Sequence, residues 1–321
     1  MNPLKKLAGQ TVIYGLSSVV GRLLNYLLVP LYTRYFLPEE YGIVTELYAY
    51  VAFLVVLLTY GIETSFFRYS QKLTNKRTVY STSLISLLVT STIFIIIVFS
   101  FSTSIADWLQ YPNNTDYVQF FALIIGLDAV SSISFARLRE QNKASRFALI
   151  RLINIFVNIG LNLFFIIYCP YALENGLPST DFVNSVYTEG YGVGYIFIAN
   201  LIASIITFLM LIPEMIKSVW IFDKSIWKKM MIYGLPLLVA GLAGITNETI
   251  DRILLKHLLP NSVNISSEIG LYGAFYKLSI LIVLFTQTFR FAAEPFFFAQ
   301  EKKKNSRKTY ADVMKYFVIM D

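Results

Sequence analysis

Long stretches without a charged residue constrain this chain more than any other feature. Residues 78–106, 152–173 and 190–213 contain no Asp, Glu, Lys or Arg. A helix needs about 20 apolar residues to cross a 30 Å hydrocarbon core, so each stretch is long enough to span a membrane. Charged residues make up only 15% of the chain, against about a quarter in a soluble domain. The pattern predicts an all-α integral membrane protein, because barrel strands would alternate apolar and polar residues.

Applied to the whole chain, the same criterion predicts about eight complete transmembrane helices and the start of a ninth. The expected spans are 10–34, 42–63, 82–104, 117–136, 148–169, 190–212, 230–254 and 269–289. We expect residues 1–220 to form a six-helix N-terminal bundle and residues 221–321 to begin a second bundle. A short apolar row before Asp321 begins the ninth helix, so we expect the second bundle to be truncated.

Basic residues alternate with the spans and predict the topology. Of the 27 Lys and Arg residues, 22 fall in five polar gaps, at 5–6, 68–77, 137–151, 217–229 and 290–315. The intervening gaps 102–117, 170–189 and 260–268 contain neither Lys nor Arg. By the positive-inside rule the basic side is cytoplasmic, which places the N-terminus in the cytoplasm. The formal charge of +7 is therefore a topology signal, and we expect no nucleic-acid partner.

An internal repeat is visible as matched motifs six helices apart. Tyr14-Gly15-Leu16 corresponds to Tyr233-Gly234-Leu235, Leu37-Pro38 to Leu259-Pro260, Gly42 to Gly270, and Phe67-Arg68-Tyr69 to Phe289-Arg290-Phe291. An even number of spans keeps the two copies in the same orientation. Parallel repeats of this kind are typical of transporters that bind substrate between their two halves.

Cations inside the spans predict a binding site. A charge at membrane depth costs about 2.5–3.5 kcal/mol on insertion scales and usually faces a protein interior or a wet cavity. Arg22 and Asn25 share one face of the first helix, Arg252 lies on the seventh and Lys277 on the eighth. Each of the three helices has a face of small and polar residues that also carries one of these cations. We therefore expect the three faces to line a common hydrated cavity that binds an anion. The planar guanidinium fork suits phosphate in particular.

Structural roles compete with this interpretation. Arg22 could pair with Asp128 in the fourth helix, and Arg252 with Glu248 one turn before it. Arg252 and Lys277 also lie near the outer boundary, where their side chains could snorkel to water. Arg34, at a span end, is interpreted as an interface anchor.

Other polar residues in the spans have two candidate roles. Asn154, Asn158 and Asn162 line one face of the fifth helix, where interhelical hydrogen bonds are favoured over ligand binding. The carboxylates that could couple transport to an ion gradient are Glu46, Asp128, Glu248 and Asp251. A single Cys169 and a single His257 argue against a cysteine-rich or histidine metal site, and we expect no metal or cofactor.

Several segments together resemble a known family. Residues 14–22, 29–42, 233–252, 270–277 and 289–297 are similar to bacterial oligosaccharide flippases. These form the polysaccharide-transporter branch of the multidrug/oligosaccharidyl-lipid/polysaccharide (MOP) exporter superfamily. The resemblance covers essentially the whole chain.

The resemblance implies two six-helix bundles around a central cavity that opens alternately to each side of the bacterial inner membrane. The implied cargo is an undecaprenyl-pyrophosphate-linked oligosaccharide, flipped to the periplasmic leaflet for polysaccharide or lipopolysaccharide biosynthesis. Arg22 fits best the cavity cation that holds the pyrophosphate in such flippases. Membrane lipids and other polysaccharide-assembly proteins are the implied partners.

Two other functions stay open at this point. A cation-coupled multidrug exporter of the same superfamily would favour buried carboxylates over Arg and Lys. A membrane glycan polymerase or glycosyltransferase usually carries large extramembrane loops, whereas the longest outer gap here is about 20 residues, 170–189. The chain also lacks an Asp-x-Asp metal motif and a Walker motif.

Overall fold

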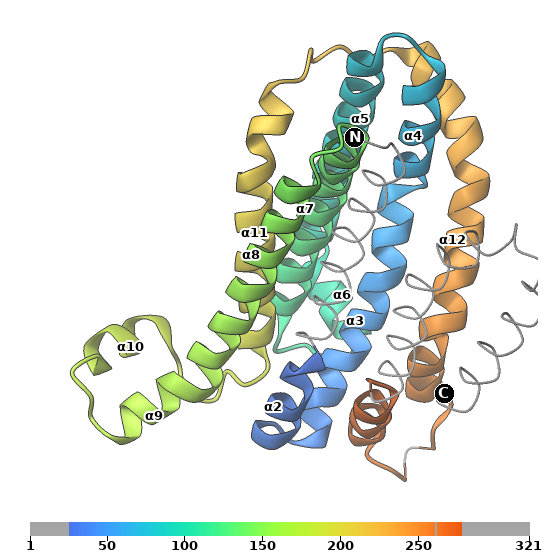
Figure 1. The fold of residues 1–321 in the computed structure, drawn as a ribbon. Helices are drawn as coiled ribbons and strands as arrows, with labels where there is room; N and C mark the ends of the chain where they lie inside the picture. Colours follow the sequence, from blue (N-terminus) through green and yellow to red (C-terminus); the bar gives the residue numbers. More distant parts are fainter. Residues whose placement is uncertain (1–25, 261, 278–321) are drawn as a thin grey trace, which may run out of the picture.

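The computed structural model describes residues 26–260 and 262–277, and this part of the chain is built from helices packed as a bundle (Figure 1). The helices are α2 (Leu28–Tyr35), α3 (Pro38–Thr59), α4 (Ile62–Lys72), α5 (Lys76–Ser100), α6 (Ser102–Trp108), α7 (Thr115–Glu140), α8 (Ala144–Leu163), the π-helix η1 (Phe164–Tyr168), α9 (Cys169–Glu174), α10 (Thr180–Val186), α11 (Gly194–Ile216) and α12 (Lys224–Leu258). Residues 265–277 are also helical.

Six stretches of the described chain are long and apolar enough to cross a membrane: Pro38–Lys72, Lys76–Ser100, Thr115–Glu140, Ala144–Glu174, Gly194–Ile216 and Lys224–Leu258. Each contains or overlaps one of the predicted spans two to seven, which confirms the all-α membrane architecture. Most of the first predicted span, most of the eighth and the start of the ninth lie outside the described residues.

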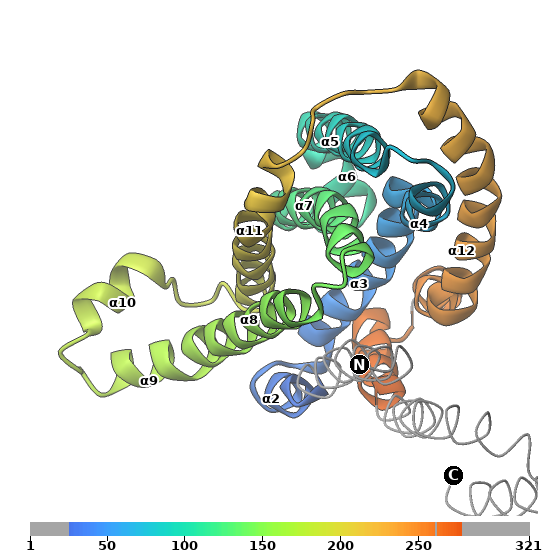
Figure 2. The ribbon, with the colours of Figure 1, turned by 45° about the horizontal axis from the view of Figure 1, so that its top comes forward.

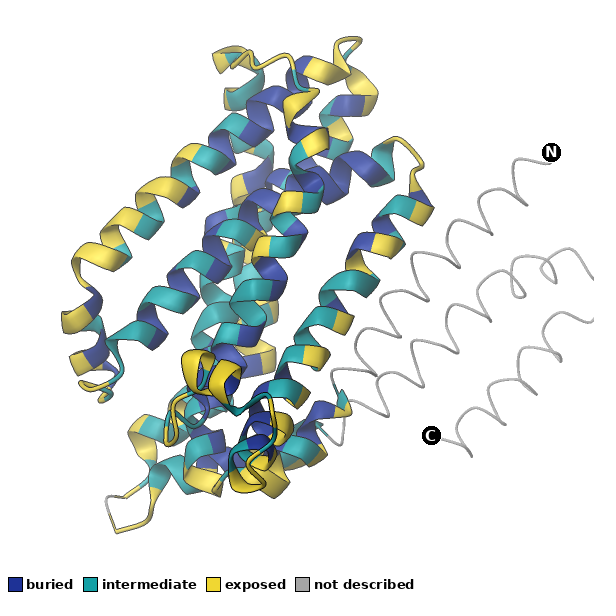
Figure 3. Ribbon diagram, turned by 90° about the vertical axis from the view of Figure 1, so that its left-hand side faces the viewer, coloured by how far each residue is buried: buried dark blue, intermediate teal, exposed yellow. Residues whose placement is uncertain are grey.

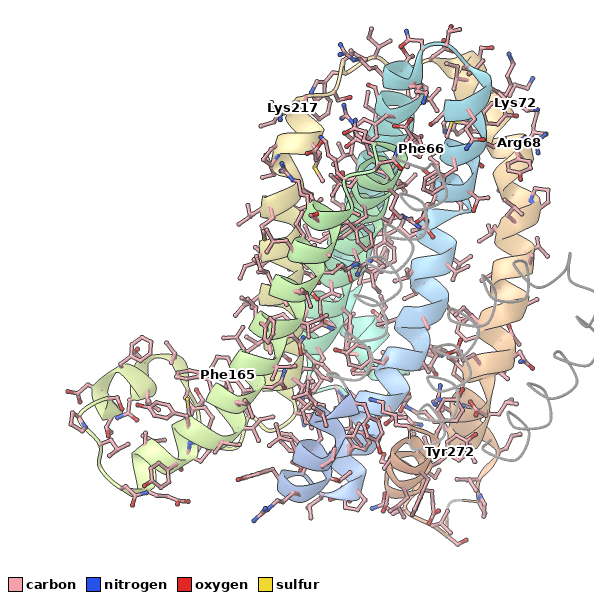
Figure 4. All side chains as sticks on the ribbon, viewed as in Figure 1. Phe66, Arg68, Lys72, Phe165, Lys217 and Tyr272 are labelled. Carbon is pink, nitrogen blue, oxygen red and sulfur yellow. The ribbon has the colours of Figure 1, made fainter. Side chains whose placement is uncertain are left out.

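Basic residues gather at one end of the bundle, as the alternation of charged gaps predicts. Arg68, Lys72 and Lys217, from α4 and the end of α11, lie at the same end, and Tyr272 lies at the other (Figure 4). Buried Glu214 of α11 pairs with Lys143 at 3.5 Å and with Arg146 at 3.4 Å. The end with Arg68, Lys72 and Lys217 is called the basic end. The opposite end is called the acidic end, because Glu39 and Glu40 of the first turn of α3 lie there.

Helix α7 lies in the centre of the bundle, with α3, α5, α8 and α11 around it (Figure 2). Its residues contribute to both main apolar clusters, through Phe121 and Ile125 in one and Ile133 and Leu138 in the other. Buried residues are concentrated along the middle of the bundle, and exposed ones lie on outward faces and at the ends (Figure 3). Burial of apolar surface around α7 therefore holds the N-terminal helices together.

The second span is broken at Tyr60–Gly61. Both residues have positive φ, 35° and 68°, and glycine adopts this conformation without the steric cost that a Cβ brings. A Cβ on Gly61 would lie 2.6 Å from the Gly234 carbonyl oxygen of α12. Gly234 is equally confined, because a Cβ there would lie 2.9 Å from Ser65 Oγ. The glycine of the repeated Tyr-Gly-Leu motif therefore allows α12 to approach the break between α3 and α4.

A lobe at the acidic end differs from the expected loop. Helix α8 continues through the π-helix η1 into α9, and α10 turns back beside it, so the lobe protrudes sideways from the bundle (Figures 1 and 2). A small apolar cluster of its own includes Phe165, Cys169, Ala172 and Val183. The predicted boundary at residue 169 was too early, because apolar residues continue in helical register beyond it.

Two glycines that the repeat equates lie against each other's helices at the acidic end. A Cβ on Gly42 would overlap the carbonyl oxygen of Ser266, and one on Gly270 would overlap that of Pro38. Gly42 and Gly270 are 228 residues apart, and so are Pro38 and Ser266. The contact is therefore reciprocal, as it is in an isologous interface around a two-fold axis. This arrangement supports the internal repeat on grounds independent of sequence similarity.

Candidate anion site between α3 and α12

Helix α12 begins at a side-chain cap and carries Arg252 and Lys256 near its far end. The Asp223 carboxylate accepts hydrogen bonds from the backbone N–H groups of Ser225 and Ile226, at 2.8 and 2.9 Å, which satisfies donors that a helix start leaves free. Pro236 lies inside the helix, yet α12 continues to Leu258. Arg252 and Lys256 are four residues apart and therefore lie on one face.

Arg252 and Lys277 lie close together against tyrosine rings. The guanidinium carbon of Arg252 is 4.1 Å from the centre of the Tyr276 ring, and Lys277 Nζ is 5.7 Å from that of Tyr41 in α3. Tyr276 directly precedes Lys277 in the chain, so both cations lie beside the same turn of the segment 265–277. The structure therefore brings together two of the four predicted cavity residues, and aromatic faces stabilise both charges. Two adjacent cations can bind an anion with more than one negative charge.

The predicted pairing of Arg252 with Glu248 takes a different form. Arg252 Nη1 donates to the backbone oxygen of Glu248 at 3.2 Å, while Glu248 itself is exposed. The neighbouring Asp251 accepts from the Arg252 backbone N–H at 2.8 Å and from the Tyr272 hydroxyl. Asp251 is thus occupied by hydrogen bonds from its own helix and from the segment 265–277, and the Arg252 guanidinium makes no carboxylate contact within the described chain.

A third cation, Lys256, pairs with Glu46 of α3 and with the chain between α6 and α7. Its Nζ lies 2.6 Å from Glu46 Oε1 and donates to the Leu109 carbonyl oxygen at 2.7 Å. The other Glu46 oxygen accepts from the Tyr111 hydroxyl at 2.6 Å. The side chains of Lys256 and Glu46 are only 9% and 2% exposed. Both charged groups have a further hydrogen-bond partner besides each other. A buried ion pair needs such additional hydrogen bonds to offset the cost of removing two charges from water.

Tyr111 is held as a hydrogen-bond donor. Burial, and next the adjacent Glu46 carboxylate, raise the pKa of its phenol well above the usual value. The hydroxyl therefore keeps its proton at physiological pH and can only donate to Glu46. Its ring also lies 4.7 Å from Lys256 Nζ. Glu46, one of the predicted coupling carboxylates, is thus part of a bridge between α3, α12 and the chain before α7.

Asp128 of α7, another predicted coupling carboxylate, is accessible to a molecule the size of water although protein atoms surround it on most sides. Its side chain is close to Ser204 of α11 and to Arg151 of α8. The guanidinium carbon of Arg151 lies 4.3 Å from the Phe135 ring centre. From the sequence, Arg151 was grouped with the basic residues of a loop. In the structure it lies two turns into α8, where its guanidinium is close to Asp128.

Two of the three asparagines of α8, Asn154 and Asn162, make interhelical hydrogen bonds, as predicted, whereas Asn158 is joined to Asn162 within the helix. Asn154 Nδ2 donates to Thr207 Oγ1 of α11 at 2.9 Å. The Tyr32 hydroxyl of α2 donates to Asn162 Oδ1 at 2.9 Å, and Asn162 Nδ2 donates to the backbone oxygen of Asn158 at 2.8 Å. The Asn154 and Asn162 amides thus join α8 to α11 and α2, as polar residues do between membrane helices.

Arg22 and Asn25, the remaining predicted cavity residues, lie outside the described residues. Sequence reasoning missed Lys256, Tyr41 and Tyr276. The one available signal for Lys256 was its spacing of four residues from Arg252 on the same helix face. Among residues 26–260 and 262–277, no group of three or more His, Cys, Asp or Glu side chains is placed to hold a metal ion.

Comparison with known proteins gives a family and a fold. The family described as "Polysaccharide biosynthesis protein" matches residues 7–299. A solved structure, described as the inward-facing conformation of a multidrug resistance MATE family transporter of the MOP superfamily, is similar with a TM-score of 0.59 at 16% identity. The similarity covers 92% of this chain, which spans 63% of that transporter's length. At such identity the likeness establishes a common fold. No curated protein matches the sequence.

Proposed function

The chain belongs to the polysaccharide biosynthesis protein family, and from that premise we propose that it flips a lipid-linked oligosaccharide across the membrane. It is a multi-pass membrane protein, and both its family and its structural neighbour are transporters rather than enzymes. A membrane polymerase or transferase is therefore disfavoured. The proposed cargo carries its sugars on undecaprenyl pyrophosphate, and the proposed destination is the outer leaflet of the bacterial inner membrane.

One observation supports this proposal above the others: Arg252 and Lys277 converge beside Tyr41 and Tyr276 between α12, the segment 265–277 and α3. A pyrophosphate carries several negative charges and many acceptor oxygens, and guanidinium and ammonium groups are its natural partners. Placing two cations together at membrane depth is costly unless an anion joins them. Arg22 and Asn25 are proposed to complete this site from the first helix.

The orientation and the division into bundles are parts of the same proposal. The basic end would face the cytoplasm, with the N-terminus inside. Residues 1–220 would form the N-terminal bundle and residues 221–321 the beginning of the second. The α3 and α12 contacts would then close the periplasmic side, in keeping with a neighbour that was solved in an inward-facing conformation.

The proposal is tested by removing the two cations in a bacterium whose only copy of the gene carries the change. We expect Arg252→Gln together with Lys277→Gln to reduce surface polysaccharide at least about tenfold, since each lost charge-assisted contact contributes roughly 1.5–3 kcal/mol. Arg34→Gln is the matched control, because Arg34 is an exposed cation at the end of α2. Arg22→Ala tests the first-helix residue separately. Unchanged export by the double variant at normal protein level would contradict the proposal.

Coupling to an ion gradient is proposed to depend on Asp128. Of the four predicted carboxylates, Glu46 is buried in the pair with Lys256, Asp251 accepts from the Tyr272 hydroxyl, and Glu248 makes no side-chain ion pair within the described chain. Asp128 is accessible and lies beside a cation. We expect Asp128→Asn to remove any dependence of transport on a proton gradient. Transport into vesicles with and without an imposed gradient measures this, and a gradient effect that survives the change would contradict it.

A multidrug exporter is the second candidate, because the structural neighbour has that function. The described site argues against it, since adjacent cations repel the cationic compounds that such exporters usually carry. Drug susceptibility of a deletion strain separates the two functions. Increased susceptibility with normal surface polysaccharide would favour the exporter.

A further inference from the structure

We propose that Lys256 is a second anion site one helical turn beyond Arg252, and that Glu46 occupies it as an internal counter-anion until the cargo's pyrophosphate displaces it. This inference rests on the proposed function and adds a residue and a mechanism to it. Displacement of Glu46 would release α3 from α12 and so open the acidic end of the bundle.

Geometry places Lys256 next along α12. Four residues of α-helix rise about 6 Å, so Lys256 lies one turn closer to the acidic end than Arg252, on the same face. Lys277 and Arg252 form the first site, and Lys256 follows it in the direction of the helix end at Leu258. Lys256 is therefore the next cation that a polyvalent anion held by Arg252 would meet along this face of α12.

Glu46 has the properties of a bound counter-anion. Its two oxygens take the contacts that a phosphate would take, one from Lys256 Nζ and one from the Tyr111 hydroxyl, each at 2.6 Å. The pair is buried, and a buried charge left without a partner is strongly destabilising. The pair therefore separates readily only when another anion takes over Lys256. Pyrophosphate can do so because it offers more charge and more acceptor oxygens than one carboxylate.

Further contacts close the same end of the bundle. The reciprocal glycine contact of Gly42 and Gly270 brings α3 against the segment 265–277. The Asn264 amide donates to the Glu39 carboxylate at 2.7 Å, across the same junction. The Glu46–Lys256 pair is the one charged, desolvated bridge described between α3 and α12 in residues 26–260 and 262–277. It is thus the contact at this junction that an anionic cargo can exchange for itself.

The first arm of the test measures the distance between α3 and α12. Spin labels are attached to cysteines at Leu37 and Leu258, which are 60% and 74% exposed, in a Cys169→Ala background. We expect Glu46→Gln and Lys256→Gln each to lengthen and broaden the distance distribution without any ligand. Lys76→Gln is the control, because it breaks the Lys76–Glu140 pair at the opposite end. An unchanged distribution in both variants would overturn the proposal.

The second arm measures binding of undecaprenyl pyrophosphate to the purified protein in zwitterionic vesicles. We expect Glu46→Gln to tighten apparent binding about tenfold, because removing a competing internal anion enlarges the competent fraction. Lys256→Gln should weaken it by a similar factor. Vesicles containing phosphatidylglycerol, a single phosphodiester, distinguish pyrophosphate recognition from general attraction to anionic lipid. Equal effects with both lipids would overturn the assignment to the cargo.

The exchanged pair Glu46→Lys with Lys256→Glu separates a binding site from a structural brace. It should restore the short distance, because the ion pair is rebuilt, but not the binding, because the cation has moved to α3. Restored binding would overturn the role of Lys256. If Arg252→Gln and Lys277→Gln weaken binding while the Glu46 and Lys256 variants do not, this inference fails and the proposed function stands. If the unaltered protein does not bind the pyrophosphate, the proposed function itself fails.

Discussion

Helices α7 and α12 are both long membrane spans of this chain, yet they differ in burial and in the helices they contact. In the most apolar 18-residue stretch of each helix, 67% of the residues of α7 are buried by the described chain, whereas only 11% of the residues of α12 are buried. Helix α7 packs on α3, α5, α8 and α11 in the centre of the bundle (Figure 2). Helix α12 contacts mainly α3 and α4 and carries Arg252 and Lys256 near its end.

The difference separates two uses of polar residues in a membrane protein. On α7, Arg137 is buried, donates to the Glu214 backbone oxygen at 2.6 Å and lies 4.1 Å from the Tyr80 ring centre. On α12, Arg252 is half-buried and its guanidinium contacts a tyrosine ring and one backbone oxygen. Polar side chains of α7 therefore pack inside the bundle, whereas the far end of α12 keeps a cation that is partly accessible and that makes no carboxylate contact within the described chain.

The largest expected effect comes from deleting apolar volume in α7. Ile133 is fully buried, so Ile133→Ala should reduce stability by about 2–5 kcal/mol, because it removes contacts and leaves a cavity. Leu254 of α12 is 44% exposed, and Leu254→Ala should change stability by less than about 0.5 kcal/mol. Thermal unfolding of the detergent-purified proteins measures both. Equal losses would show that α12 is as tightly packed as α7.

The two arginines give the next largest difference. Arg137→Gln should cost about 1.5–3 kcal/mol, because it removes a charge-assisted hydrogen bond inside the bundle. Arg252→Gln should cost no more than about 1 kcal/mol, the value of a partly exposed cation–π contact. The same unfolding measurement applies, with cargo binding as a second readout that Arg252→Gln should impair. A large stability loss from Arg252→Gln would make Arg252 a structural residue.

Glycine substitutions test the junction at the acidic end with a smaller effect. Gly42→Ala should cost about 1–3 kcal/mol of the closed arrangement, because the added methyl group overlaps the Ser266 carbonyl oxygen. Gly244→Ala on α12 is the control, since its Cβ would meet no atom within 4 Å. Alanine should there stabilise the helix by about 0.5–1 kcal/mol. Unfolding temperature and the α3–α12 spin-label distance report both, and an unchanged distance in Gly42→Ala would contradict the tight contact.

The smallest expected effect concerns the exposed ion pair between α5 and α7. Lys76 Nζ lies 2.7 Å from Glu140 Oε1, and the Lys76 side chain is 57% exposed. Lys76→Gln should therefore cost less than about 1 kcal/mol, because water and salt screen exposed pairs. The loss should shrink further as salt is added during unfolding. A larger, salt-independent loss would place this pair in a less polar environment than its exposure indicates.

The fold was largely predictable because the length and the apolar composition of a segment are enough to identify a membrane-spanning helix. A segment in lipid must satisfy its backbone hydrogen bonds internally, so long apolar runs become helices. The six testable spans and the shared basic end both followed from that constraint. The break at Tyr60–Gly61 did not, because it depends on how closely Gly234 of another helix approaches.

The candidate site was predictable only in part. Arg252 and Lys277 were identified because isolated cations in apolar runs are costly and therefore informative. Lys256 was missed, because near a helix end a lysine resembles an interface anchor. Glu46 was assigned to ion coupling without its partner, which lies 210 residues away. Two residues so far apart in the sequence carry no local pattern that predicts their contact.

By itself, the sequence determined that this chain is a helical membrane protein, where most of its spans lie, and which loops share a side. These properties depend on transfer of each segment from water to lipid, which is local and additive. The tertiary structure alone decided that Glu46 neutralises Lys256, that Arg252 and Lys277 are neighbours, and that Gly42 and Gly270 meet reciprocally. Those contacts depend on how helices distant in sequence pack against one another, and no single segment encodes that packing.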